Sequence, residues 1–195
     1  AHAATDMTIS LDGPEAMARE AIAASSDGFE ILKVKLGGDP AVDLNRLESV
    51  HEAVPSARFR LDANQGWGAK EAIRMIRRIE DAGIPVDLVE QPTPKANLDA
   101  LAQVTAAVDT PVMADESVAD ERDAWEILRR EAADLINIKL AKCGGIRPAL
   151  AIADLAATAG VGCMMGAMME PRVSVAAAAH VALAHPNIQL VDLGS

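Results

Sequence analysis

Residues 31–40 read Ile-Leu-Lys-Val-Lys-Leu-Gly-Gly-Asp-Pro, and this stretch decides the fold because a strand, a turn and a helix start follow one another in it. The apolar and β-branched residues predict a strand over 30–36. The two glycines end that strand, and Asp39 with Pro40 is typical of the first turn of a helix. A strand that passes directly into a helix is half of a β-α-β unit, so the stretch predicts parallel strands.

The same unit repeats along the whole chain. We predict strands over 7–10, 30–36, 58–62, 86–90, 111–114, 135–140, 162–168 and 188–191. The helices between them are predicted over 14–25, 40–53, 69–82, 98–108, 121–130, 147–159 and 173–184. This alternation indicates the α/β class, and it predicts a TIM-like (β/α)7β barrel that forms one domain over 1–195. A doubly wound open sheet is the alternative, and it would gather its ligand groups at one switch point.

Single charged residues at the strand ends favour the barrel. Five apolar runs each end in one such residue, and these are Lys35, Asp62, Glu90, Asp115 and Lys139. Successive members are 24 to 28 residues apart, which is about the length of one strand and one helix. Because they are spread over consecutive strands, they do not mark a single switch point. The carboxyl ends of parallel barrel strands meet at one face, so all five are predicted at one mouth.

Composition restricts the classes of partner and compartment. The chain has 195 residues, is 50% apolar and carries a formal net charge of -11, which disfavours binding to nucleic acid or to an anionic membrane. No run approaches the roughly 18 apolar residues of a membrane span. The two cysteines form no C-x-x-C pair, so we expect free thiols in a reducing cytoplasm.

Three of the strand-end residues are carboxylates. Asp62, Glu90 and Asp115 offer only oxygen ligands, which predicts a hard divalent cation, Mg²⁺ first and Mn²⁺ as a tolerated substitute. Asn64 lies on the same strand face as Asp62 and is expected to orient a ligand or a base. Glu116 is expected to support Asp115 rather than to bind the metal itself, and the alternative is that the two residues exchange these roles.

The lysines predict acid–base chemistry. Lys33 and Lys35 are two residues apart on one strand and therefore point to the same face, which we predict to be the interior. The alternative is that both face outward into solvent. Neighbouring ammonium groups disfavour each other's charge, so we expect a lysine pKa lowered towards that of a usable base. By strand parity Lys139 points inward from the opposite side, whereas Lys142 is expected to be a loop charge or an auxiliary group.

This set of residues predicts the removal of a proton next to a carboxylate. Such a proton is very weakly acidic, so a lysine cannot remove it unless a cation stabilises the negative charge that develops. Lys35 and Lys139 would then act on opposite faces of a small carboxylate substrate. The sequence contains no nucleophile elbow and no G-x-G-x-x-G, which weakens hydrolase and dinucleotide-binding interpretations.

The motifs together resemble the enolase superfamily, and within it the muconate-lactonizing subgroup. The matching segments are Lys33–Lys35, Leu61–Gln65, Val89–Pro92, Ala114–Ser117, and Ile138-Lys139 followed by Gly144-Gly145. The resemblance implies that Lys35 and Lys139 are the acid–base pair. It also implies that Asp62, Glu90 and Asp115 bind Mg²⁺.

Within the subgroup, residues 164–172 and 190–193 are most similar to dipeptide epimerases of the L-Ala-D/L-Glu type. The resemblance implies that Asp192 is the first residue of an Asp-x-Asp pair that holds the ammonium group of the substrate. Gly194 stands where the second Asp would be. The alternatives are an o-succinylbenzoate synthase or N-acylamino acid racemase, and a muconate cycloisomerase.

Members of this family also carry a capping domain that closes the mouth of the barrel. We expect this chain to lack one, because the barrel uses all of its residues. An uncovered mouth is expected to make catalysis by the chain weak, and a further alternative is therefore an inactive barrel core. Association into a homo-oligomer is compatible with the sequence.

Overall fold

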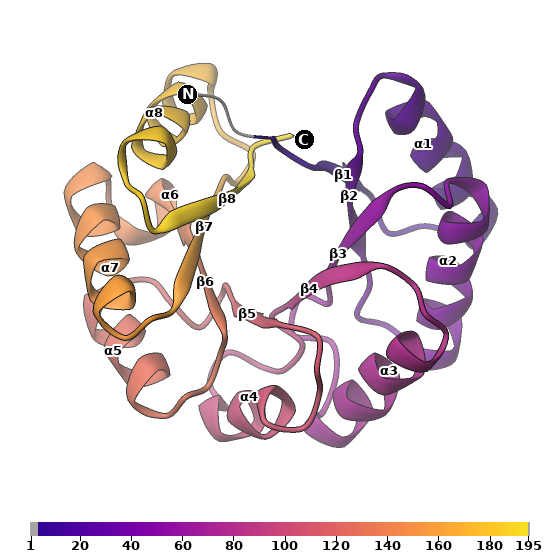
Figure 1. Ribbon diagram of the computed structural model, residues 1–195, viewed down its shortest axis with the longest axis horizontal. Helices are drawn as coiled ribbons and strands as arrows, with labels where there is room; N and C mark the ends of the chain where they lie inside the picture. Colours follow the sequence, from indigo (N-terminus) through magenta and orange to yellow (C-terminus); the bar gives the residue numbers. More distant parts are fainter. Residues whose placement is uncertain (1–3, 195) are drawn as a thin grey trace.

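The computed structural model describes residues 4–194, which form a ring of eight parallel strands inside a layer of helices (Figure 1). Residues 1–3 and 195 of the predicted domain lie outside the described residues. The strands are β1 (Met7–Ile9), β2 (Ile31–Lys35), β3 (Arg58–Asp62), β4 (Val86–Glu90), β5 (Val112–Ala114), β6 (Leu135–Lys139), β7 (Gly162–Gly166) and β8 (Ile188–Asp192). Each pairs in parallel with the next in chain order. The predicted (β/α)7β barrel is confirmed.

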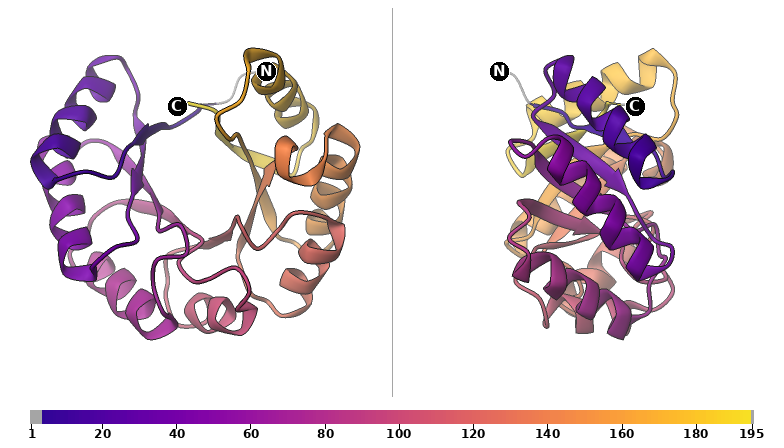
Figure 2. Two further views of the ribbon diagram at one scale, coloured as in Figure 1. Left: turned by 180° about the vertical axis from the view of Figure 1, so that it is seen from behind. Right: turned by 90° about the vertical axis from the view of Figure 1, so that its right-hand side faces the viewer.

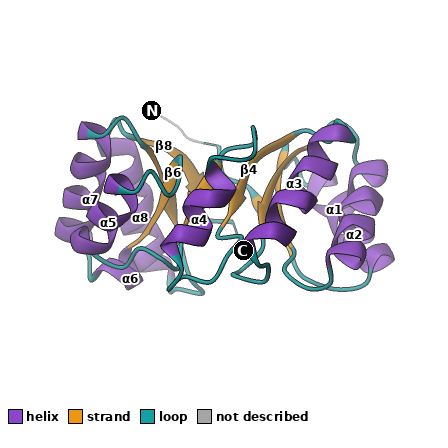
Figure 3. Cartoon of the chain, turned by 90° about the horizontal axis from the view of Figure 1, so that it is seen from below, coloured by secondary structure: helices purple, strands orange, loops and turns teal. Residues whose placement is uncertain are grey.

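The helices form the outer layer in every view (Figures 2 and 3). They are α1 (Pro14–Ser26), α2 (Pro40–Ala53), α3 (Ala69–Asp81), α4 (Leu98–Thr105), α5 (Glu121–Arg129), α6 (Leu140–Cys143), α7 (Ile146–Thr158) and α8 (Arg172–Ala184). Within residues 4–194, none of them is both long enough and apolar enough to cross a lipid bilayer.

Polar caps start several of the helices where the sequence predicts a start. The side chain of Asp39 accepts a hydrogen bond from the backbone N–H of Ala41 at 2.9 Å, and Pro40 occupies the first turn of α2. Asn97 caps α4 in the same way, accepting from the N–H of Ala100 at 3.0 Å. These caps satisfy N–H groups that have no partner inside the helix.

The structure differs from the sequence prediction after Lys139. The predicted strand continues to residue 140, but the chain instead turns into the short helix α6, which the sequence does not predict. The carbonyl of Leu140 accepts hydrogen bonds from the N–H groups of Gly144 and Gly145. Both glycines have positive φ angles, 88° and 124°, which other residues rarely adopt. Strand β7 also ends at Gly166 rather than at residue 168.

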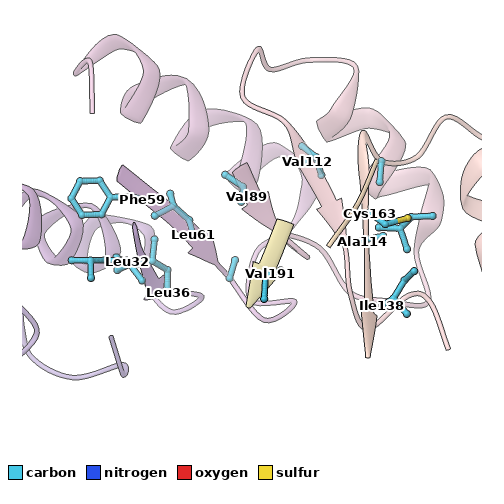
Figure 4. Close-up of a cluster of buried hydrophobic side chains, with 14 of the residues drawn as sticks. Leu32, Leu36, Phe59, Leu61, Val89, Val112, Ala114, Ile138, Cys163 and Val191 are labelled. Carbon is cyan, nitrogen blue, oxygen red and sulfur yellow. The ribbon is translucent and has the colours of Figure 1, made fainter. Parts of the chain in front are cut away.

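The core has two parts on opposite faces of the strands. Outward-facing side chains pack against the helices, and Figure 4 shows ten of them labelled, including Leu32, Leu61 and Val89. Inside the ring, Leu88, Met113 and Met164 form a small apolar cluster against Leu135 and Leu190. This cluster fills part of the interior as a packed apolar plug, and most of the buried polar groups lie nearer the carboxyl ends of the strands.

Two tightly packed loops fix the strand ends that carry Lys35 and Asp62. A Cβ added to Gly37 would lie 2.0 Å from the carbonyl oxygen of Ala63, and one added to Gly66 would lie 2.1 Å from that of Gly37. Neither distance is possible between real atoms, so the loops after β2 and β3 can approach each other only through these glycines. The loop positions in turn place the two strand ends at the mouth.

Gly66→Ala is expected to lower the stability of the chain because its methyl group would overlap the Gly37 backbone. Overpacking of this kind costs about 1–3 kcal/mol in the free energy of unfolding. Chemical denaturation measures the loss. Gly13→Ala is the matched control, because a Cβ at Gly13 meets nothing within 4 Å. Equal stability of the two variants would contradict the proposed loop contact.

Candidate active site

A cavity of about 560 Å³ opens at the carboxyl ends of the strands. Seven of the nine site residues predicted from the sequence line it, namely Lys33, Lys35, Asn64, Asp115, Glu116, Lys139 and Asp192. Asp62 and Glu90, the other two, are fully buried and contact the lysines of the cavity wall. A cavity of about 580 Å³ at the opposite end of the barrel contains none of the nine.

Lys33 is the most deeply buried lysine of the site, with 3% of its surface exposed. Its Nζ lies 2.8 Å from Glu90, 2.8 Å from Asp192 and 3.1 Å from Asp62. Burial acts to lower the pKa of Lys33, but the three carboxylates outweigh it and hold the pKa well above its ordinary value. The expectation that adjacent lysines lower each other's pKa is therefore wrong for Lys33, because carboxylates and not ammonium groups surround it.

Lys35 points into the same interior but nearer to the mouth, with 29% of its side chain exposed. Its Nζ donates to Asp62 Oδ2 at 2.7 Å and to Asn64 Oδ1 at 2.8 Å. Asn64, in turn, donates from Nδ2 to Glu116 Oε1 at 3.3 Å. A polar chain thus runs from the end of β3 to the end of β5, and Lys35 can reach both the buried carboxylate and the open cavity.

Lys139 approaches from the other side of the ring. Its Nζ lies 2.7 Å from Asp115 Oδ2 and 3.8 Å from Glu90 Oε1. Strand β6 is four positions from β2 in the order of eight strands, so Lys139 and Lys35 stand on opposite sides of the carboxylates. Burial acts to raise the pKa of Asp115, but Lys142 and Lys139 reverse this and hold it well below its usual range.

Lys142 is not a loop charge. Its Nζ donates to the Asp115 carbonyl oxygen at 2.6 Å and also contacts the Asp115 carboxylate, while burial lowers the pKa of Lys142 itself. Of the two roles expected from the sequence, Lys142 therefore fits that of an auxiliary group of the site. Strand parity gave the wrong expectation because residues 140–143 are helical, and a helix turns the Lys142 side chain back over Asp115.

Glu90 lies at the centre of the charge cluster. Burial raises its pKa to about 8, and the nearby charges of Asp62 and Asp115 act in the same direction against Lys33 and Lys139. Glu90 Oε1 accepts a hydrogen bond from Asn137 Nδ2 at 2.9 Å. Oε2 has no hydrogen-bond partner, although the Lys33 ammonium is 2.8 Å away.

The donor set fits a hard divalent cation. Asp62, Glu90 and Asp115 project from three consecutive strands, and all their donor atoms are carboxylate oxygens. In this arrangement Lys33 and Lys139 supply the positive charge that the carboxylates share. Within residues 4–194, no three acidic, His or Cys side chains converge closely enough to hold a metal ion as they stand.

Three residues that the sequence analysis did not single out hold the site in shape. The amide of Gln91 accepts from the N–H groups of Asp115 and Ser117 and donates to the Ser117 hydroxyl at 2.8 Å. Asn137 orients Glu90. Gly166 leaves room for Asn137 and Lys139, since an added Cβ would lie 2.6 Å from Asn137 Oδ1 and 3.0 Å from Lys139 Cε. A glycine inside a strand signals close approach, so Gly166 was detectable in the sequence.

This barrel with its lysines and carboxylates corresponds to a known family. The Enolase C-terminal domain-like family matches residues 16–194. The chain belongs to that family.

Several curated relatives match almost all of the chain. A protein of Bacillus subtilis (strain 168) named L-Ala-D/L-Glu epimerase is 49% identical over 190 residues, covering 96% of this chain and 52% of the relative. A hydrophobic dipeptide epimerase of Enterococcus faecalis is 43% identical over 191 residues, covering 97% of this chain and 53% of that protein. The chain spans about half the length of the curated relatives that it matches.

Solved structures agree with the sequence relationship. A substrate-liganded complex of the L-Ala-D/L-Glu epimerase from B. subtilis superposes with a TM-score of 0.97 at 47% identity, covering 98% of this chain and 54% of that one. The dipeptide epimerase from E. faecalis V583, complexed with Mg and the dipeptide L-Leu-L-Tyr, gives a TM-score of 0.95 at 42% identity. Coverage is again 98% of this chain and 54% of that one.

Gln91→Leu is expected to destabilise the chain, because it leaves the buried N–H groups of Asp115 and Ser117 without acceptors. Each unsatisfied buried group costs about 1–3 kcal/mol in the free energy of unfolding. Urea denaturation measures the change, and Gln103→Leu on the exposed face of α4 is the control. If Gln91→Leu were as stable as the control, the Gln91 amide would not be holding the loop after β5.

Proposed function

We propose that this chain is the catalytic barrel of an epimerase that inverts the configuration of a dipeptide at the carbon next to its carboxylate. One observation carries the proposal: two lysines, Lys35 and Lys139, enter one cavity from strands on opposite sides of the ring, with three carboxylates between them. Inversion needs a base on one face of a carbon and an acid on the other, and this arrangement supplies both.

The relatives support the same reaction class. Proteins named L-Ala-D/L-Glu epimerase and hydrophobic dipeptide epimerase match nearly the whole chain. The chain spans about half of each relative, so we propose, by similarity to them, the activity and substrate of the protein to which this barrel belongs. The dipeptide complex of the E. faecalis epimerase favours a dipeptide over a muconate or a succinylbenzoate.

The two lysines exchange roles according to the configuration of the substrate. For one epimer, neutral Lys35 removes the α-proton and the Lys139 ammonium donates a proton to the opposite face. For the other epimer the direction reverses. Asn64 and Asp62 orient Lys35 through bonds of 2.8 Å and 2.7 Å, and Asp115 orients Lys139 at 2.7 Å. Positioning of this kind makes a weak base effective.

Asp62, Glu90 and Asp115 would hold Mg²⁺, with Mn²⁺ as the expected substitute. The bound cation supplies positive charge that stabilises the negative charge developing on the substrate carboxylate. Lys33, which meets Glu90 and Asp62 from the interior, keeps the carboxylates from repelling one another. Glu116 supports the site through its bond with Asn64.

Asp192 is the proposed partner of the ammonium group at the start of the dipeptide. It lies at the end of β8 and lines the cavity. Gly194 provides no second carboxylate, and a Cβ there would lie 2.1 Å from the backbone oxygen of Asp6, so this backbone accepts only glycine. Recognition of the ammonium group by this chain therefore rests on Asp192.

Mg²⁺ binding is expected at one site and is expected to disappear in Glu90→Gln and in Asp115→Asn, because each variant removes a charged oxygen ligand. Isothermal titration calorimetry measures the binding. Glu126→Gln, on the exposed surface of α5, is the control for loss of a carboxylate. Unchanged Mg²⁺ affinity in both site variants would contradict the ligand assignment.

Each lysine is expected to exchange the α-proton of only one epimer. In D₂O, Lys35→Ala should lose exchange with one configuration of a dipeptide and keep it with the other, and Lys139→Ala should show the reverse. Loss of a positioned general base typically costs about 10²–10⁴ in rate. Proton NMR of a dipeptide library follows the exchange.

The control for the exchange experiment is Lys95→Ala, since Lys95 is an exposed lysine outside the cavity. Loss of water from a substrate instead of inversion would favour the synthase alternative. If wild-type chain and both variants gave no exchange with any dipeptide, the proposed function would be wrong for this chain.

A further inference from the structure

A buried ion pair lies below the candidate site and takes no part in the proposed chemistry. Arg60 Nη1 is 2.7 Å from Asp6 Oδ2, and both residues are almost completely inaccessible to solvent. Neither lines the cavity at the mouth. Burial of two charges is costly, and an apolar pair of the same size often stabilises a fold equally well. Stability alone is therefore a weak reason for burying this pair.

The pair lies where the barrel closes, at the junction of β8 with β1, which we call the seam. Within residues 4–194 the backbone pairing there is one isolated bridge between Thr5 and Val191. Arg60 reaches across the interior from β3, and the same Nη1 that meets Asp6 donates to the Val191 carbonyl oxygen at 2.7 Å. Arg60 thus holds the last part of β8 from the interior where the strand ladder does not, while Thr5 and Thr8 bond to Leu193 and Gly194 just beyond it.

The next residue along β8 is Asp192, so the seam leads directly into the site. Asp192 Oδ2 accepts from Lys33 Nζ at 2.8 Å, and Lys33 in turn meets Glu90 and Asp62. Burial raises the pKa of Asp6 to about 7, and the charge of nearby Asp192 acts in the same direction, against Arg60. One continuous chain of contacts therefore joins Arg60 to the carboxylates at the mouth.

We propose that Asp6 and Arg60 are positioning residues, which hold the end of β8 so that Asp192 meets the Lys33 ammonium. The role rests on the proposed function, because that function places Lys33 and Asp192 in the site. When the seam loosens, Asp192 withdraws from Lys33. Lys33 then loses one of three carboxylate partners and becomes accessible from the cavity that it lines.

The test replaces the ion pair by an apolar pair of similar size, Asp6→Leu with Arg60→Met, and follows Lys33 by competitive acetylation and mass spectrometry. Such a swap is expected to leave the chain folded. Acetylation of Lys33 should rise several-fold relative to exposed Lys70, and kcat/KM for dipeptide epimerisation should fall by about ten- to a hundredfold, as misplaced site groups cause. Asp6→Asn keeps the shape and the hydrogen bonds of Asp6, so it should change both readouts much less.

The matched control removes another Arg–Asp pair, Arg58 with Asp87, which is 2.9 Å apart and has 64% of the Arg58 side chain exposed. Arg58→Met with Asp87→Leu should alter neither readout. A folded Asp6→Leu, Arg60→Met variant with wild-type acetylation of Lys33 would overturn the proposal. Should that variant not fold, Arg60→Lys takes its place, because it keeps a positive charge beside Asp6 while removing the guanidinium that also reaches Val191, and the same two outcomes decide. If the wild-type chain epimerises no dipeptide, the proposed function fails, while the acetylation of Lys33 still decides whether the pair positions Asp192.

Discussion

Everything at the mouth of this barrel depends on the balance between buried lysines and buried carboxylates. Lys33 alone meets Glu90, Asp62 and Asp192 within 3.1 Å, and Lys139 and Lys142 both meet Asp115. Neither set of charges could be buried without the other, because an isolated ion in an apolar interior costs far more than a folded domain can supply. Because the lysines and carboxylates have to be buried next to one another, the apolar cluster inside the ring ends where this charged layer begins. In the proposed function, these charges would also offer a divalent cation and an anionic substrate a surface that carries both signs of charge.

The register of the parallel strands decides which residues take part in this balance. In the pairing of β2 with β3, Lys33 is opposite Arg60 and Lys35 is opposite Asp62; in that of β3 with β4, Asp62 is opposite Glu90. Side chains two residues apart share a face, so the plug and the charged layer form successive levels of the same interior. A shift of one residue in any strand would turn its charged group towards the helices and an apolar group towards the cavity. The glycine contacts between the loops after β2 and β3 oppose such a shift at the strand ends.

Local patterns were sufficient to predict the barrel and to select the five strand-end residues, because a strand ending in one charged residue is visible in a few consecutive letters. The alternation of strand side chains gave the wrong prediction for Lys142, because the chain leaves the strand for α6 there and side chains no longer alternate with a two-residue period. Gln91 was missed because its amide acts through backbone groups 24 and 26 residues away. Arg60 meets Asp6 across 54 residues of sequence and across the barrel interior. Nothing in the letters around either residue shows that they meet.

The site residues differ in how the barrel fixes them: backbone ladders hold those on the middle strands, whereas side chains hold the one on β8. Strands in the middle of the order have a neighbour on each side, so ladders of backbone hydrogen bonds fix the backbone at Asp62 and Glu90. The two outer strands in that order lack such a ladder between them, yet β8 carries Asp192. Side chains replace the missing backbone bonds there. Thr5 Oγ1 accepts from the N–H of Leu193 at 2.9 Å, Thr8 Oγ1 donates to the Gly194 carbonyl oxygen at 3.4 Å, and Arg60 reaches the Val191 carbonyl oxygen from the interior. Arg60 is long enough to do so and has more donors than one acceptor can use, so it joins Asp6 and Val191 at once. Through these bonds, Arg60 positions Asp192 at the junction of β8 with β1, where the backbone pairing is weakest.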